Sequence, residues 1–218
     1  MKFLTYAAAT LLMAIGVATS ARAENPAHLK QLLDTRSCEG CDLTGAQLEG
    51  VDLNGANLQN ADLSGANLKG ANLNEANFNR ALLVEADLEN TSLIAAKLHG
   101  ADLTRTNFSN ANLTLAGMVI ANLQDANLRG ANLVGANLES ADLTGANLQD
   151  VRQSVTNLGQ VQLREGSLYG YDISGVNLRD TDLSGTNLSN ADLSASDLAG
   201  ANLNDANLLN TNLMNARR

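Results

Sequence analysis

A large apolar residue recurs at every fifth position over most of this chain. From residue 41 to residue 215 the sequence divides into 35 consecutive five-residue units, and the central residue is Leu in 30 of them. The remaining centres are Phe78, Phe108, Met118, Gln153 and Ile173. A small residue, mostly Ala, stands two positions before each centre, with Asn or Asp between them, as in the units ADLSG and ANLVG.

This period excludes the two regular elements. Five residues of an α-helix leave a drift of about 140°, which winds the apolar positions around the whole helix. An odd period in a strand places successive apolar residues on opposite faces. A short repeat that fits neither element is typical of a stacked solenoid, in which each coil covers the next. The Gly, Asn, Asp and Ser residues around each centre supply turns.

The units resemble the pentapeptide-repeat family, whose pattern is A-(D/N)-L-x-x. The resemblance covers about 80% of the chain without a change of phase. It implies an all-β fold, namely a right-handed quadrilateral (four-sided) β-helix solenoid with one unit per side and four units per coil. The central residue and the preceding small residue point inward, and the other three positions face solvent. Thirty-five units then make a rod of ~42 Å at the ~4.8 Å spacing of β-strands.

A short capping α-helix is predicted before the first coil. Asn25 suits the N-cap of a helix and Pro26 suits its first turn. One face of this segment is apolar and carries Leu29, Leu32 and Leu33. We therefore expect residues 24–40 to form an N-terminal cap, followed by the repeat domain 41–218.

The first 23 residues have the pattern of an export signal. Lys2 precedes an apolar stretch at residues 3–18, and the Ala-Arg-Ala sequence at 21–23 fits a cleavage site before Glu24. The apolar run is shorter than the ~20 residues of a spanning helix. We expect residues 1–23 to be removed, leaving no membrane span, with a retained N-terminal anchor as the alternative. Exported, cyanobacterial-like members of the family are the most similar, which implies the periplasm or the thylakoid lumen.

Residues 151–175 depart from the repeat. Gln153 stands at a Leu position, and Gly166 and Tyr171 stand at small-residue positions. A buried amide without partners costs roughly 1–3 kcal/mol. Because the phase is the same on both sides, we predict a distorted coil around 151–171. The alternative is a bulge between two rods.

Cys38 and Cys41 form the one reactive-looking motif, C-x-x-C. By phase both point inward at the first coil, and in an exported protein a disulfide is the expected state. We predict a bond that fastens the cap to the rod. A redox-active or thiol-sensing pair is the alternative, and a zinc site lacks two further ligands.

No catalytic or cofactor site can be assembled from the remaining residues. The two histidines, His28 and His99, have no partner at ligand or triad spacing, and we interpret both as lone exposed residues. The glycines recur at the turn position rather than in a phosphate-binding loop. We therefore predict a non-enzymatic protein with no cofactor and no bound metal.

The charge is strongly acidic and concentrated on one predicted side. The whole chain has a net charge of -9, which argues against a nucleic-acid binder that neutralises phosphates. With four units per coil, one side has only two basic residues, Arg105 and Arg164, against nine acids. The acids are Asp42, Asp62, Glu85, Asp102, Asp125, Asp142, Glu165, Asp182 and Asp205. This acidic face is a candidate surface for a basic partner or divalent cations, and simple solubility is the alternative.

Apolar residues gather at outward positions of the third predicted side and the adjoining one. They are Ile94, Leu115, Val134 and Val155, with Val119 and Ile120 beside them. Contiguous apolar patches are seldom left exposed without use, so we predict a lateral protein contact here. The alternative is that the turns tuck these side chains in.

The open C-terminal coil has no helix to cover it in this sequence. Its apolar residues offer an end for an end-to-end homodimer, as in some relatives, and are Leu208, Leu209, Leu213 and Met214. The leading functional prediction is an exported scaffold that binds an unidentified protein. DNA mimicry is disfavoured because a ~42 Å duplex carries about 25 phosphates, whereas the outward residues net -12, and because export removes the protein from DNA.

Overall fold

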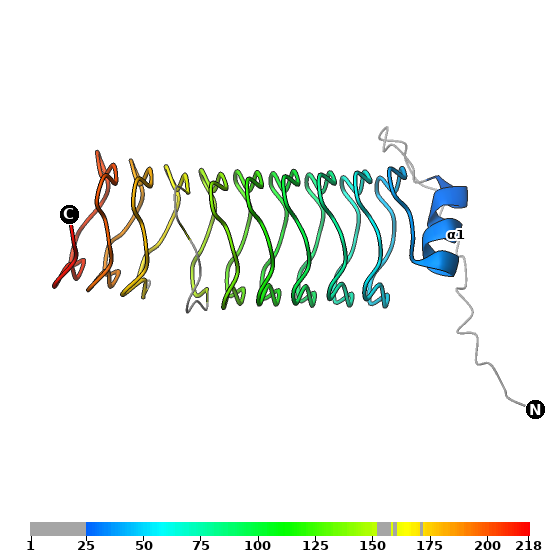
Figure 1. The fold of residues 1–218 in the computed structure, drawn as a ribbon, viewed down its shortest axis with the longest axis horizontal. Coiled ribbons are helices and arrows are strands. Elements are labelled where there is room, and N and C mark those ends of the chain that lie inside the picture. Colours follow the sequence, from blue (N-terminus) through cyan, green and yellow to red (C-terminus); the bar gives the residue numbers. More distant parts are fainter. Residues whose placement is uncertain (1–24, 152–157, 159–160, 171) are drawn as a thin grey trace, which may run out of the picture.

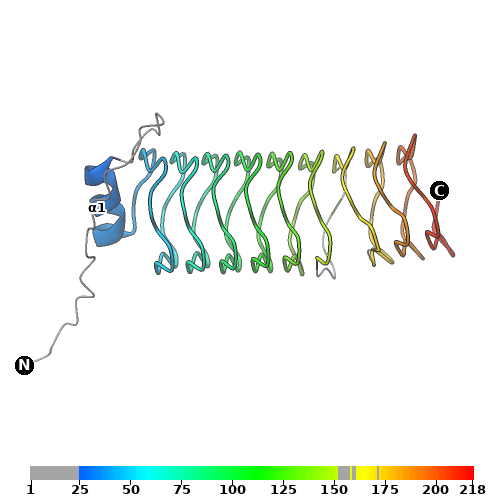
Figure 2. The same ribbon diagram turned by 180° about the vertical axis from the view of Figure 1, so that it is seen from behind.

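The computed structural model describes residues 25–151, 158, 161–170 and 172–218, which form a straight stack of coils with one helix at its N-terminal end (Figures 1 and 2). Helix α1 spans Pro26–Thr35. Elsewhere in this described part the chain forms isolated single-residue β-bridges, and no strand of two or more residues occurs there. The predicted export signal, residues 1–23, lies outside the described residues.

Every bridge is parallel and joins residues 20 positions apart. The series begins at Ser37 with Asn57 and ends at Asp197 with Arg217. A coil therefore contains four units, and the fold is a right-handed quadrilateral β-helix. We number the five positions of a unit from the small residue. The sides are named by their first units: side 1 from residue 41, side 2 from 46, side 3 from 51 and side 4 from 56.

Three backbone hydrogen bonds per unit link neighbouring coils. The N–H of Leu43 donates to the carbonyl of Asp62 at 2.7 Å, and the N–H of Asp62 donates back to the carbonyl of Cys41 at 2.8 Å. The N–H of Gly45 donates to the carbonyl of Ser64 at 2.9 Å. This pattern repeats along the rod, so single-residue bridges are enough to pair the backbone of each side.

The fifth position has a left-handed backbone in every unit where the structure describes it. The N–H of Ala46 donates to the carbonyl of Leu43 at 3.0 Å, which closes a four-residue turn. Gly45, the third residue of that turn, has a φ of 71°. A type II turn requires a positive φ at this place, and glycine adopts it without steric cost. The turn thus explains why glycine recurs at the fifth position.

The first and third positions form one continuous core. Both phenylalanines of the repeat, Phe78 and Phe108, are fully buried among the Leu and Ala columns. Thr106 replaces Ala at a first position, and its hydroxyl donates to the carbonyl of Leu83 in the preceding coil at 2.8 Å. The buried hydroxyl therefore has a partner, and the core tolerates it.

Two details of the repeat differ from the sequence prediction. The solenoid starts one unit earlier than residue 41, because Ser37 bridges to Asn57 and the N–H of Cys38 donates to the carbonyl of Asn57 at 2.7 Å. The second position does not simply face solvent. Its side chain accepts a hydrogen bond from the backbone of the same unit, two residues later, as in Asp62, whose Oδ1 accepts the N–H of Ser64 at 3.0 Å.

The predicted distorted coil falls partly outside the described residues, which exclude Gln153 and Tyr171. On side 1 the register of the bridges continues past it, because Gln162 bridges to Asp142 on one side and to Asp182 on the other. Gly166 is buried, and a Cβ there would lie 3.1 Å from the carbonyl oxygen of Leu163. Only glycine fits this position without a local shift.

Candidate functional site

The predicted acidic face forms one long side of the rod, side 1. Its second-position residues stack through consecutive bridges, so those of neighbouring coils lie about 4.8 Å apart. The fifth-position acids lie beside them at the corner between sides 1 and 2. Both basic residues of this side are already paired within it. Arg105 contacts Glu85 at 2.7 Å and Arg164 contacts Glu165 at 3.2 Å.

The second-position carboxylates have a structural task as well as a charge. Oδ1 of Asp42 accepts the N–H and the hydroxyl of Thr44, and Asp102 does the same with Thr104. Asn uses the same oxygen in the other units, which is why either residue fits the repeat. The Asn side chain also donates to the preceding coil, as from Asn122 to Asp102 at 3.4 Å. Sequence reasoning treated these residues as a free surface and missed this ladder.

Hydrogen bonding favours the ionised form of two of these acids, Asp142 and Asp182. Burial raises the pKa of Asp142, but hydrogen bonds from Gln124 and Thr144 outweigh it, and the pKa lies below its usual value. The hydroxyl of Ser184 is the largest cause that lowers the pKa of Asp182. These groups therefore stay negatively charged well into acid conditions.

The acidic face does not assemble a cation site within the part of the chain that the structure describes. No group of three or more His, Cys, Asp or Glu side chains there could hold a metal ion. The spacing explains this result, because each carboxylate is tied to its own turn.

The predicted apolar contact is exposed in part. Leu115 and Ile120 are the most exposed of its members, at 61% and 60%, while Ile94, Val119 and Val134 are half-buried. Val155 lies outside the described residues. The side chain of Leu115 leans over Gly135 in the next coil, since a Cβ at Gly135 would meet its Cδ2 at 2.7 Å.

Leu115 and Ile120 also have an unusual backbone. Their φ angles are 59° and 58°, at fifth positions where the repeat usually has glycine. A left-handed backbone is strained for a bulky residue and most of all for a β-branched one. The patch therefore combines exposure with backbone strain.

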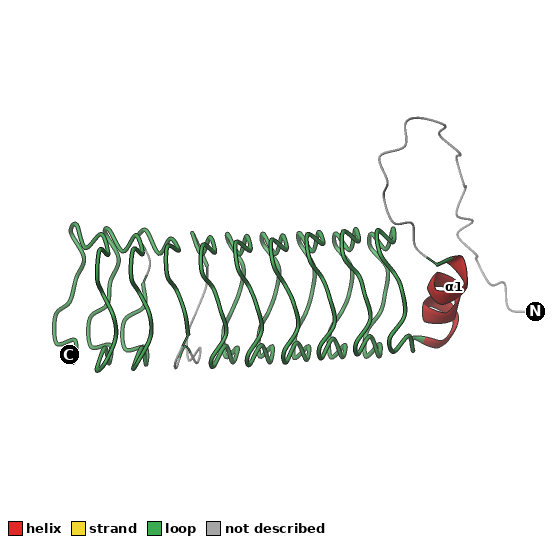
Figure 3. Cartoon of the chain, turned by 90° about the horizontal axis from the view of Figure 1, so that it is seen from above, coloured by secondary structure: helices red, strands yellow, loops and turns green. Residues whose placement is uncertain are grey.

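Helix α1 covers the first coil, as predicted (Figure 3). Asn25 caps the helix by accepting the N–H of Ala27 at 3.0 Å, and Pro26 opens it. Leu32 is fully buried, but Leu33 is 50% exposed, so the predicted apolar face was wrong for Leu33. Leu33 follows Leu32 directly and so lies about 100° around the helix from the side that meets the coil.

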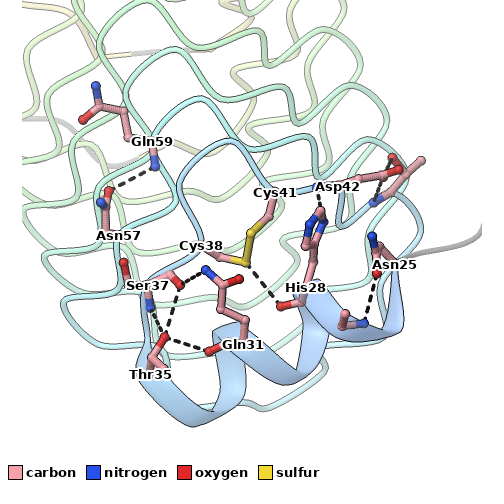
Figure 4. The surroundings of a disulfide bond; sticks show 12 residues. Asn25, His28, Gln31, Thr35, Ser37, Cys38, Cys41, Asp42, Asn57 and Gln59 are labelled. Carbon is pink, nitrogen blue, oxygen red and sulfur yellow. Dashed lines mark hydrogen bonds between the residues drawn. A yellow bond between two sulfur atoms is a disulfide. The ribbon is translucent and has the colours of Figure 1, made fainter.

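His28 joins the helix to the coil, a role that sequence reasoning missed. Its Nδ1 accepts the N–H of Asp42 at 3.0 Å (Figure 4). The interpretation of His28 as a lone exposed residue is therefore wrong, because the side chain is half-buried and bonded. His99 is exposed at a fourth position, where its backbone N–H donates to Asn79 and its carbonyl accepts the N–H of Arg80.

The cysteines are joined by a disulfide at the same junction (Figure 4). Cys38 is 0% and Cys41 is 4% exposed. Sγ of Cys38 lies 3.2 Å from the carbonyl oxygen of His28, a contact between the disulfide and the helix. Reactive cysteine pairs need access to their sulfurs, so this burial favours the structural interpretation over a thiol sensor.

The last coil leaves its apolar residues largely open. Leu209 and Met214 are 65% and 68% exposed, and Leu213 is partly buried against the core. The end-to-end homodimer stays a prediction. Among the described residues no helix is both long enough and apolar enough to cross a membrane.

Comparison with known proteins identifies the repeat. The family described as pentapeptide repeats (8 copies) matches residues 41–80, 71–110, 121–152 and 181–217. No curated protein matches this chain.

Several solved structures are similar. HetL of the cyanobacterium Nostoc sp. strain PCC 7120, a pentapeptide repeat protein involved in heterocyst differentiation regulation, is 28% identical. That match covers 88% of this chain and 95% of HetL, with a TM-score of 0.48. Rfr23 of the cyanobacterium Cyanothece 51142 is 32% identical over 60% of this chain and 97% of its own, with a TM-score of 0.40.

A pentapeptide repeat protein of the Arabidopsis thaliana thylakoid lumen is 28% identical, with a TM-score of 0.43. That match covers 44% of this chain and 66% of the plant protein. The family match spans more than half of the chain and coincides with the four-unit register of its bridges. The chain belongs to the pentapeptide-repeat family.

Proposed function

We propose that this protein is a non-enzymatic interaction scaffold in an exported compartment, and that side 1 binds a basic protein partner. The observation that carries the proposal is the column of carboxylates on side 1. The bases of that side are neutralised by their own neighbours, so its excess negative charge faces outward.

The rigidity of this column supports a binding role. Asp42, Asp102 and Asp142 are each held through Oδ1 by the turn that they close. The second oxygen of Asp142 also accepts the side-chain N–H of Gln124 at 2.6 Å. A rigid array of charges loses little conformational entropy when a partner binds. Asp102, Asp142 and Asp182 repeat every second coil, so they fit a partner whose cations are spaced by about 10 Å.

Two features support an exported location. Residues 1–23 have the pattern of a cleavable signal, and their removal with Lys2 and Arg22 takes the net charge from -9 to -11. The disulfide at the cap suits an oxidising compartment such as the periplasm or the thylakoid lumen.

The absence of catalysis is part of the proposal. Side chains that could act as acids, bases or nucleophiles instead hold the repeat together, as Asp62 and Thr106 do through bonds to backbone groups. A scaffold uses these groups to hold a shape, whereas an enzyme needs them free and convergent.

The test is affinity capture from native periplasmic or lumenal extract. The wild type is compared with a triple variant of side 1, Asp62→Asn, Asp102→Asn and Asp142→Asn. Asn keeps the Oδ1 acceptor, so the turns survive and only charge is lost. A matched control removes three charges from the other sides, with Asp87→Asn, Asp192→Asn and Asp197→Asn.

The expected result is a basic protein captured by the wild type and the control, and lost at least tenfold with the side 1 variant. Capture that both variants lose equally would indicate a general charge effect. Capture that both retain would show that side 1 is not the binding surface. Either outcome overturns the proposal.

A further inference from the structure

Two units of the rod depart from the consensus in opposite ways. The unit at residues 81–85, ALLVE, has Leu82 at the second position. The unit at residues 116–120, AGMVI, has Gly117 there. These are the one large apolar residue and the one glycine at the second position of any unit in the repeat. The first unit lies on side 1 and the second on side 4.

Leu82 is an apolar projection between two acids. It bridges to Asp62 in the preceding coil and to Asp102 in the following coil. The residue is 43% exposed, and Val84 lies beside it, half-buried, at the corner of the same unit. Side 1 therefore carries an apolar ridge with a carboxylate one coil above it and another one coil below.

Gly117 is a gap between apolar residues and a cation. Leu115 stands at the corner before it, and Ile120 at the corner after it. Its φ is not in the left-handed range, so the backbone does not require glycine, and a Cβ there would meet no atom within 4 Å. Lys97 bridges to Gly117 from the preceding coil and is exposed.

The positive charge at this gap is uncompensated. Within the described residues neither Lys97 nor Arg80 has a carboxylate within ion-pair distance, although the chain is strongly acidic. Arg80 belongs to the same side, and its stem lies over Gly100, with Cγ 3.8 Å from where a Cβ would be. That direction leads along the corner toward Ile120.

The fold itself does not need either departure. In a consensus unit the Asp or Asn at the second position accepts the N–H of the fourth residue. Leu82 and Gly117 lack that acceptor, and the N–H groups of Val84 and Val119 have no partner among the described residues. The exposed apolar surface and the left-handed backbone of Leu115 and Ile120 further lower the stability of the folded protein.

We propose that side 1 of one copy of this protein docks against side 4 of a second copy, with Leu82 seated over Gly117. The complementarity has three parts. The projection fits the gap, Val84 meets one of the two apolar corners beside it, at Leu115 or at Ile120, and Asp62 or Asp102 pairs with Lys97. Both strips follow the same ladder of bridges, so neighbouring positions on the two rods are spaced alike.

The geometry makes this association head-to-tail. Sides 1 and 4 are adjacent sides of one rod, so each copy offers both the ridge and the gap and uses them with different neighbours. Such a contact is heterologous and does not stop at a dimer. A patch of a few coils is small, so we expect dissociation constants between about 10 μM and 1 mM, in the class of transient interfaces.

The inference goes beyond the proposed function, because this acidic chain is not the basic partner proposed for side 1. Sedimentation equilibrium of the purified protein tests it without any extract. The weight-average mass should rise steadily with concentration. Leu82→Asp and Gly117→Asn should each weaken self-association at least tenfold. Both changes restore the consensus, so thermal unfolding should be unchanged or shifted upward.

A mixing experiment distinguishes this contact from non-specific self-association. Leu82→Asp keeps the gap and Gly117→Asn keeps the ridge, so a 1:1 mixture should associate again but stop at a dimer. Tyr169→Ser removes a large side chain of at least equal exposure from side 2 and should leave the wild-type behaviour unchanged.

Three outcomes overturn the inference: a wild type that stays monomeric up to about 1 mM, variants that associate like the wild type, or a mixture that stays monomeric. Loss of association in Met214→Asp with retention in Leu82→Asp also overturns it, in favour of the C-terminal end. None of these outcomes bears on capture of a basic partner, because they are measured on the purified protein alone.

Discussion

Gly65 and Gly117 form a matched pair of positions that differ in backbone conformation. A Cβ would meet nothing within 4 Å at either glycine. Gly65 has a φ of 66° at the fifth position of its unit, whereas Gly117 is not in the left-handed range. Substitution by Ala therefore adds the same methyl group to open space in both cases, and only the backbone differs.

The expected effects have opposite signs. A left-handed backbone costs an L-residue about 1–2 kcal/mol. Replacing Gly by Ala lowers the entropy of the unfolded chain and stabilises by about 0.4–1 kcal/mol where the native backbone is compatible. Gly65→Ala should therefore lower the free energy of unfolding by about 0.5–1 kcal/mol. Gly117→Ala should raise it by about 0.4–1 kcal/mol.

Urea unfolding followed by far-UV circular dichroism measures both changes, because the chain has no Trp and only three Tyr. Low protein concentration keeps the lateral contact from contributing. The dependence of the unfolding free energy on urea concentration (the m-value) must agree between variants, since repeat arrays can unfold in more than one step. The reasoning is refuted if Gly65→Ala is as stable as the wild type, or if Gly117→Ala loses as much as Gly65→Ala.

Three further predictions concern acid, the cap and the core. Asp142, Asp182 and Asp192 have pKa values lowered in the folded state, so they stabilise it above about pH 4 and lose that contribution as the pH falls further. Urea unfolding between pH 7 and pH 2 should show a level region followed by a fall in acid, and a fall that begins near neutrality contradicts this account. Replacing both Cys38 and Cys41 by Ala opens a short loop and should cost about 2 kcal/mol. Limited proteolysis should show the loss at α1, with His28→Ala behaving similarly and His99→Ala unchanged. Phe108→Ala should cost about 3–5 kcal/mol, and Leu213→Ala, in the partly open last coil, less than half as much in the same unfolding assay.

The solenoid could be predicted from sequence because its cause is local and repeated. Thirty Leu residues in one phase exclude a single helix or strand, and the resemblance to pentapeptide repeats implied the four units per coil that set the register of the bridges. The helix was also predictable, since Asn25 and Pro26 are adjacent signals for its start. Its orientation was not, because the side that meets the coil depends on packing, which buries Leu32 and exposes Leu33.

The surfaces were harder to predict than the core. Assigning residues to sides correctly placed the acids in one column. It did not predict the hydrogen bonds that tie Asp62 and its equivalents to their turns. The left-handed backbone of Ile120 was also hidden, because its own preference opposes that conformation and the turn imposes it. His28 was missed since its partner is a backbone N–H, which leaves no trace in the pattern of side chains.

The constant register of the bridges makes chain length and surface direction separable quantities. Inserting or deleting four units lengthens or shortens the rod by one coil and returns every later side chain to its original side. Inserting a single unit keeps the core pattern intact but rotates everything downstream by a quarter turn, so the acids of side 1 continue on side 2. Such a rod can change its reach in steps of about 4.8 Å without redesign. Each inserted unit moves all downstream surface residues to the next side of the rod.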